Sequence, residues 1–189
     1  MPDDTKLLAV LIDADNIPAK YADPILKEIT KFGEPALRRV YGDWSSGRLN
    51  NWSQKVRDLG LVAHQETANT VGKNASDIGL VIDAMDILHT GRFDGFVLVS
   101  SDSDFTRLAS RIREQGLDVY GMGMRKTPAA FVKACKRFIY VENLVSETVK
   151  KARAETPKPT EPAEHPTQLE DPTKLVIRAM DAIEQEDEW

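Results

Sequence analysis

The chain has 189 residues, of which 41% are hydrophobic and 29% are charged. These proportions are typical of one globular domain with a tail, and no apolar run approaches the roughly 20 residues that span a bilayer. The formal net charge of −5 argues against non-specific coating of nucleic acid, but it leaves room for a local basic track. Because the N-terminus is acidic, we expect a cytoplasmic protein with no membrane contact.

Hydrophobic periodicity predicts strands and helices that alternate along the chain. In chain order we expect strand 7–12, helix 21–32, strand 37–41, helix 49–59, strand 61–64, helix 75–88, strand 96–100, helix 105–114, strand 118–122, helix 128–135 and strand 138–141. This alternation is typical of an α/β fold, a three-layer α/β/α Rossmann-like sandwich with a central, mostly parallel sheet. The apolar residues of helix 75–88, including Ile78 and Ile82, recur at helical spacing and predict a buried helix.

The composition divides the chain into three parts. Residues 1–145 form the predicted domain, and residues 146–172 contain the end of a helix and a proline-rich linker. Residues 173–189 form an amphipathic helix that either docks on the domain or begins a second module, and we favour the second interpretation.

Two strongly apolar strands run directly into acidic residues. Asp13, Asp15 and Asn16 follow strand 7–12, and Asp102 and Asp104 follow strand 96–100. The carboxyl ends of parallel strands open into the crevice where ligands bind, so these side chains are expected around one point. Capping or turn formation explains some of them, Asp15 in particular, but not two acidic strand ends together.

Helix 75–88 adds a third acidic contribution. Asp77 lies in its first turn, where a single acid is common and needs no functional explanation. It becomes a candidate site residue only together with the acids at the two strand ends. Asp83 lies nearly two turns further on and is expected to support the site from behind. Asp86 is expected at the surface.

A cluster of carboxylates calls for a hard cation, because like charges at close range take up protons unless a cation offsets them. The three histidines show no zinc-binding spacing, and the single cysteine, Cys135, is predicted to be a small buried hydrophobic residue. Magnesium or manganese is therefore favoured over zinc. Such an ion would suit phosphodiester hydrolysis.

Three short segments are similar in order and spacing to the motifs of a known family: LIDADN at residues 11–16, KNASD at residues 73–77 and VSSDSDF at residues 99–105. The chain resembles, over about residues 6–145, the NYN domain of the PIN-like nuclease superfamily, particularly its LabA-like branch. The resemblance implies a PIN-like fold and an endoribonuclease that acts on RNA with Mg²⁺ or Mn²⁺. Its metal-binding acids would be Asp13, Asp77, Asp102 and Asp104, and Asn16 would be the polar residue that orients the site.

The C-terminal part also has a resemblance. Residues 175–184 are similar to the first helix of a LOTUS-type (OST-HTH) winged-helix module, which in similar proteins is followed by an acidic stretch and a tryptophan, as in residues 186–189. The rest of such a module is absent from this sequence. We therefore expect a truncated start of a LOTUS module and assign no RNA-binding role to it.

Four residues are candidates for contact with RNA. Lys73 lies in the loop that leads to Asp77, and Arg125 and Lys126 follow strand 118–122, so their positive charges would contact phosphates. Trp44 follows strand 37–41, where an exposed ring would stack on an unpaired base, whereas Trp52 is expected in the core.

Two other functions remain open from the sequence. One is a non-catalytic NYN-like module that binds RNA or a protein partner, and a homo-oligomer is compatible with either function. The other is a phosphatase of the haloacid-dehalogenase type, with Asp13 as nucleophile and Asp15 as acid–base. That family usually has Thr or Val soon after its second aspartate, whereas here Asn16, Ile17 and Pro18 follow.

Overall fold

The computed structural model describes residues 5–65 and 75–145. In chain order its elements are β1 (Leu7–Asp13), η1 (Ala19–Tyr21), α1 (Ala22–Ile29), β2 (Glu34–Gly42), η2 (Trp44–Ser46), α2 (Asn50–Asp58), β3 (Val62–Gln65), α3 (Ala75–His89), β4 (Gly95–Val99), α4 (Phe105–Glu114), β5 (Asp118–Gly123), α5 (Ala129–Ala134) and β6 (Arg137–Tyr140). None of the helices in these two ranges is long and apolar enough to cross a bilayer. The predicted linker and C-terminal helix lie outside the described residues.

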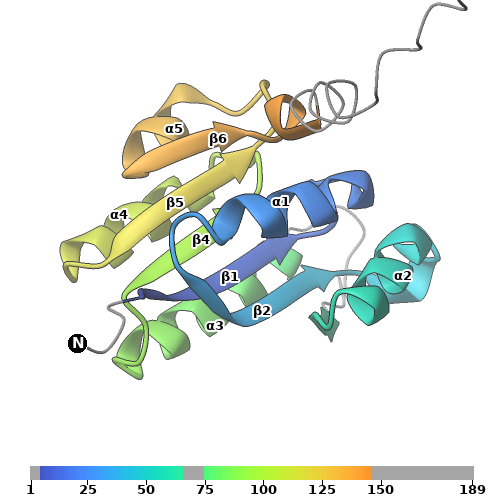
Figure 1. The fold of residues 1–189 in the computed structure, drawn as a ribbon, viewed down its shortest axis with the longest axis horizontal. Helices are drawn as coiled ribbons and strands as arrows, with labels where there is room; N and C mark the ends of the chain where they lie inside the picture. Colours follow the sequence, from blue (N-terminus) through green and yellow to red (C-terminus); the bar gives the residue numbers. More distant parts are fainter. Residues whose placement is uncertain (1–4, 66–74, 146–189) are drawn as a thin grey trace, which may run out of the picture. The chain divides into compact units, whose positions relative to one another are not determined.

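Six strands of the described residues form one parallel sheet in the order β3-β2-β1-β4-β5-β6 (Figure 1). This is the predicted α/β three-layer fold, and its sheet is entirely parallel. From β1 the chain first builds outward to β3, and it then crosses to β4 and builds outward to β6. The carboxyl ends of β1 and β4 therefore flank the point where the strand order reverses, which is where open α/β sheets bind ligands.

The alternation of side chains along β1 creates a core on each face of the sheet. Leu8, Val10 and Ile12 pack with α1 and α2 on one face, and Ala9 and Leu11 pack with α3, α4 and α5 on the other (Figure 1). Asp13 continues the second series, so strand alternation directs it toward the face covered by α3 and α4.

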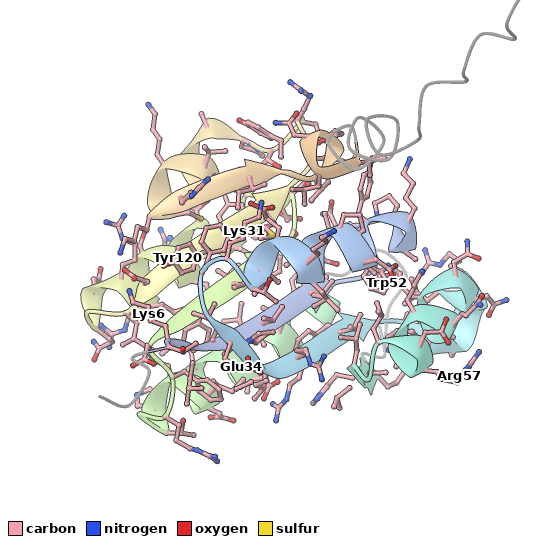
Figure 2. All side chains as sticks on the ribbon, in the orientation of Figure 1. Lys6, Lys31, Glu34, Trp52, Arg57 and Tyr120 are labelled. Carbon is pink, nitrogen blue, oxygen red and sulfur yellow. The ribbon has the colours of Figure 1, made fainter. Side chains whose placement is uncertain are left out.

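Trp52 of α2 is confirmed as a core residue. Its side chain is buried, and its indole Nε1–H donates to the carbonyl oxygen of Ile17 at 2.7 Å. Figure 2 labels Trp52 among the side chains. Cys135 is buried as predicted, and burial raises the pKa of its thiol to about 12.

The expected burial of α3 is only half correct. Ile78 and Ile82 are 62% and 58% exposed, whereas Leu80, Ala84 and Ile87 face the sheet. The helix is apolar on more than one side, so periodicity could not decide which side packs. Strand β2 also begins three residues earlier than expected, at Glu34.

Candidate metal centre

The acidic residues predicted from the sequence lie on three elements that meet at one edge of the sheet. Strands β1 and β4 pair up to Ile12 and Val99, so Asp13 and the turn that contains Asp102 follow adjacent strand ends. Asp77 is in the first turn of α3, which packs against β1 and β2. The topological switch point therefore carries carboxylates from both halves of the fold.

Three of these carboxylates form a compact group. Asp77, Asp102 and Asp104 each offer one oxygen, and these oxygens all lie within 4.8 Å of one another. Asp77 and Asp102 are partly buried, whereas Asp104 is exposed. Asp104 occupies the N-cap position of α4, but its side chain makes no capping hydrogen bond. Helix capping therefore does not account for its carboxylate.

Asp13 lies beside this group and is held by two donors. It is 3% exposed; its Oδ1 accepts the backbone N–H of Asn16 at 3.1 Å, and its Oδ2 accepts the Ser100 hydroxyl at 2.8 Å. Ser100 Oγ in turn accepts the backbone N–H of Asp102 at 3.1 Å. Ser100 thus couples the ends of β1 and β4.

The role of Ser100 was not predicted from the sequence. Its residue type is common in turns, and only the pairing of β4 with β1 brings its hydroxyl to Asp13. The one signal in the sequence was a serine directly after the apolar run 96–99, and the structure shows that this serine is buried.

The electrostatics of the centre oppose full ionisation. Burial raises the pKa of Asp13 to about 7, and the charge of Asp77 raises it by a smaller amount. The hydrogen bond from Ser100 acts in the opposite direction and lowers this pKa. Burial, followed by the charges of Asp102 and Asp104, raises the pKa of Asp77 to about 6. A divalent cation would remove this repulsion, and an all-oxygen donor set fits Mg²⁺ or Mn²⁺ rather than zinc.

Asp83 anchors the helix that carries Asp77. Its two carboxylate oxygens accept hydrogen bonds from the Arg39 guanidinium and the Tyr41 hydroxyl of β2. Burial, then the contact with Asp83, raises the pKa of Tyr41, so the phenol stays a donor. Tyr41 is also the strand partner of Asp13, so this clamp joins α3 to the sheet next to the centre.

The predicted RNA contacts have different surroundings. Arg125 and Lys126 follow β5 and are exposed, and Arg125 Nη2 donates to Asn143 Oδ1 at 2.6 Å. Trp44 is partly buried, and its Nε1–H donates to the carbonyl oxygen of His64 at 2.8 Å. Lys73 lies outside the described residues. Asp86 is exposed, as expected.

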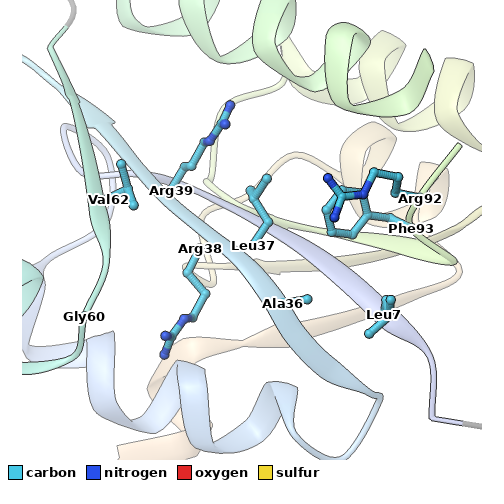
Figure 3. Close-up of a pocket in the computed structure, with 9 residues that line it drawn as sticks. All are labelled: Leu7, Ala36, Leu37, Arg38, Arg39, Gly60, Val62, Arg92 and Phe93. Carbon is cyan, nitrogen blue, oxygen red and sulfur yellow. The ribbon is translucent and has the colours of Figure 1, made fainter. Parts of the chain in front are cut away.

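A cavity of about 380 Å³ lies at the opposite edge of the sheet, near the start of β1, β2 and β3. Figure 3 shows that Arg38 and Arg39 extend from opposite sides of β2 there. The described residues that line this cavity include no acid. It is therefore separate from the carboxylate centre.

A comparison with protein families matches residues 7–143 to the family described as "NYN domain". The chain belongs to the NYN domain family. This places it in the PIN-like nuclease superfamily, and the acidic group Asp77, Asp102 and Asp104 lies within the matched residues.

Comparison with solved structures supports the fold of this NYN domain. A protein of unknown function, VPA0982 from Vibrio parahaemolyticus RIMD 2210633, matches with a TM-score of 0.64 and 21% identity, covering 76% of this chain and 98% of that chain. MurG of Acinetobacter baumannii matches at 11% identity with a TM-score of 0.46, covering 70% of this chain and 40% of that chain. A comparison with curated proteins finds no match. The Vibrio protein supports the fold alone.

Proposed function

We propose that this NYN domain is a metal-dependent endoribonuclease that hydrolyses phosphodiester bonds in RNA. The observation that carries the proposal is the group of three carboxylates within 4.8 Å at the topological switch point, with the buried Asp13 beside it. Structural acids are ordinarily paired with cations. The Asp13 carboxylate instead accepts from the Ser100 hydroxyl and the Asn16 backbone N–H, and the Asp102 carboxylate accepts from the Asp104 backbone N–H.

The metal would be Mg²⁺ or Mn²⁺, held by Asp77, Asp102 and Asp104 with Asp13 next to them. Such an ion supplies polarisation of a phosphoryl oxygen and a lower pKa for attacking water. Asp104 is the exposed member, so it lies on the side from which a phosphate would approach. Asn16 orients Asp13 through its backbone N–H.

The chain's own residues position the acids of the centre. Ser100 and the Asn16 amide hold Asp13 in one orientation. Ser100 also fixes the backbone of Asp102, so both acids keep their relative positions.

The substrate would be positioned by residues around the carboxyl edge of the sheet. Arg125, Lys126 and Lys73 would contact phosphates, and Trp44 would stack on a base. The LabA-like branch and the LOTUS-type start of the C-terminal part are further elements of this proposal, as is action in the cytoplasm.

The burial of Asp13 favours hydrolysis over phosphoryl transfer to a carboxylate. A nucleophilic aspartate must be ionised and reachable, but Asp13 is 3% exposed and both of its oxygens accept hydrogen bonds. A nuclease needs only that Asp13 support the centre.

The test is cleavage of a labelled RNA with Mn²⁺, Mg²⁺ or EDTA, alongside calorimetric titration of the protein with Mn²⁺. Asp102→Asn should lose about 100-fold or more in cleavage rate and bind Mn²⁺ more weakly. Asp86→Asn, an exposed acid of α3, is the matched control and should behave as the wild type. Metal binding and RNA binding without cleavage that depends on Asp102 would identify a non-catalytic binding module instead.

A further inference from the structure

A second cavity, of about 260 Å³, adjoins the carboxylate centre on the face covered by α1 and α2. Its lining includes Asp15 and Asn16 of the β1–α1 connection and Arg48 and Asn51 beside α2. Asn16 belongs to both places, because its backbone N–H holds Asp13 and the residue also lines the cavity. The two sites are therefore separated by one stretch of chain.

The floor of the cavity is apolar and preformed. Ile17, Leu49 and Trp52 are 1%, 6% and 2% exposed and belong to the core of that face. The indole of Trp52 is fixed by its hydrogen bond to the carbonyl oxygen of Ile17. A flat ring could contact the small exposed part of this floor without reorganising it, because these side chains are held in the core.

The rim is polar and rich in acceptors. Asp15 is exposed, and one of its oxygens accepts the Asp43 backbone N–H at 3.4 Å. Asn51 is exposed in the first turn of α2. Beneath the rim, Asn16 Oδ1 is buried and has no hydrogen-bond partner among the described residues. The exposed Asn51 amide can donate or accept, whereas the Asp15 carboxylate only accepts.

A cationic group stands at the mouth. The Arg48 side chain is 71% exposed, and its Nη2 lies 3.8 Å from Asp43 Oδ2. An exposed guanidinium next to the cavity is a suitable contact for a phosphate outside it.

We infer that this cavity binds one unpaired nucleobase that carries an exocyclic amino group, next to the phosphate at the carboxylate centre. This inference rests on the proposed function, because the base and the phosphate would belong to one RNA strand. The volume is slightly below the roughly 300 Å³ at which drug-sized ligands begin, which suits a single base. An amino group would donate to Asp15, as cytosine N4 does to acidic side chains, whereas uracil would turn a carbonyl oxygen toward it.

The experiment measures base binding separately from cleavage. Asp102→Asn protein in EDTA is titrated with CMP, UMP and ribose 5-phosphate, and binding is followed by NMR from the Trp52 indole N–H and the Asn51 side-chain amide. We expect UMP to bind about tenfold more weakly than CMP, and ribose 5-phosphate more weakly still. Only ligands that enter the cavity should shift the Trp52 signal.

Two variants and one control test the recognition. Asp15→Asn is nearly isosteric and gains a donor, so it should bring CMP and UMP to within about twofold. Asn51→Ala should weaken CMP binding about threefold or more. Asn50→Ala removes the neighbouring amide, which does not line the cavity, and should bind CMP as the parent protein does.

Equal affinity for CMP, UMP and ribose 5-phosphate would overturn the inference, because it would reduce the site to phosphate binding by Arg48. Absence of a Trp52 shift at saturation would also overturn it. Neither result depends on RNA cleavage. The inference and the proposed nuclease function can therefore fail independently.

Discussion

Replacing Asp13 by asparagine should stabilise the metal-free protein at neutral and alkaline pH. Asp13 is 3% exposed, and its pKa rises from 3.8 to about 7 in the folded protein. The folded state therefore binds the Asp13 proton more tightly than the unfolded state does. Its free energy of unfolding must fall as the pH rises from about 4 to about 7, and it then levels off.

The magnitude follows from the size of this pKa change. Each pKa unit corresponds to about 1.4 kcal/mol, so ionisation of Asp13 lowers the free energy of unfolding by about 4 kcal/mol above pH 7. Asparagine keeps an acceptor for the Asn16 N–H but loses the carboxylate oxygen that accepts from Ser100, at a cost of about 1–2 kcal/mol. Asp13→Asn should thus gain about 2–3 kcal/mol at pH 8 and lose about 1–2 kcal/mol near pH 4.

The assay is urea unfolding in EDTA at pH 4.5, 6 and 8, with wild type, Asp13→Asn and the exposed control Asp86→Asn. The stability difference between the first two should change sign between pH 4.5 and 8, while the control should differ by less than about 0.5 kcal/mol throughout. If Asp13→Asn is destabilised equally at every pH, Asp13 is not an ionised, strained group at neutral pH. The reasoning from burial would then be refuted.

Three further outcomes follow from the described contacts. Ser100→Ala removes the hydroxyl that joins Asp13 to Asp102, so the free energy of unfolding in urea should fall by about 1–3 kcal/mol and calorimetry should show weaker Mn²⁺ binding. Unchanged metal affinity would show that Ser100 does not position the acids. Tyr41→Phe removes one arm of the Asp83 clamp and should also weaken Mn²⁺ binding, whereas an affinity equal to wild type would limit the clamp to stability. Cys135 should react with a thiol reagent only after unfolding, because burial raises its pKa to about 12; fast reaction of the native protein would contradict this.

Much of the fold was accessible from the sequence because its strands carry their own signal. The apolar runs that became β1 and β4 are buried on both faces, and only central parallel strands need such runs. The acids at their ends were also accessible, because a charge directly after a buried strand has few structural explanations. The structure brings two of them, Asp102 and Asp104, together with Asp77 of α3.

Other features depended on contacts between distant parts of the chain. The exposure of Ile78 and Ile82 depends on which side of α3 faces the sheet, and several sides of that helix are apolar. The partners of Asp83 lie on β2, more than 40 residues away, so periodicity within α3 could not reveal them. The cavity beside Asp15 forms only where the β1–α1 connection meets α2.

The sequence by itself determined the alternation of elements, the parallel sheet and the acidic strand ends, because each of these is a local pattern of side chains. Only the tertiary structure decided that three acids form a close group and that Asp13 is buried beside them. This arrangement depends on the register of β1 against β4 and on the Ser100 hydroxyl, which joins the ends of these two strands. Burial then set the pKa of Asp13, and burial exists only once both faces of the sheet are covered.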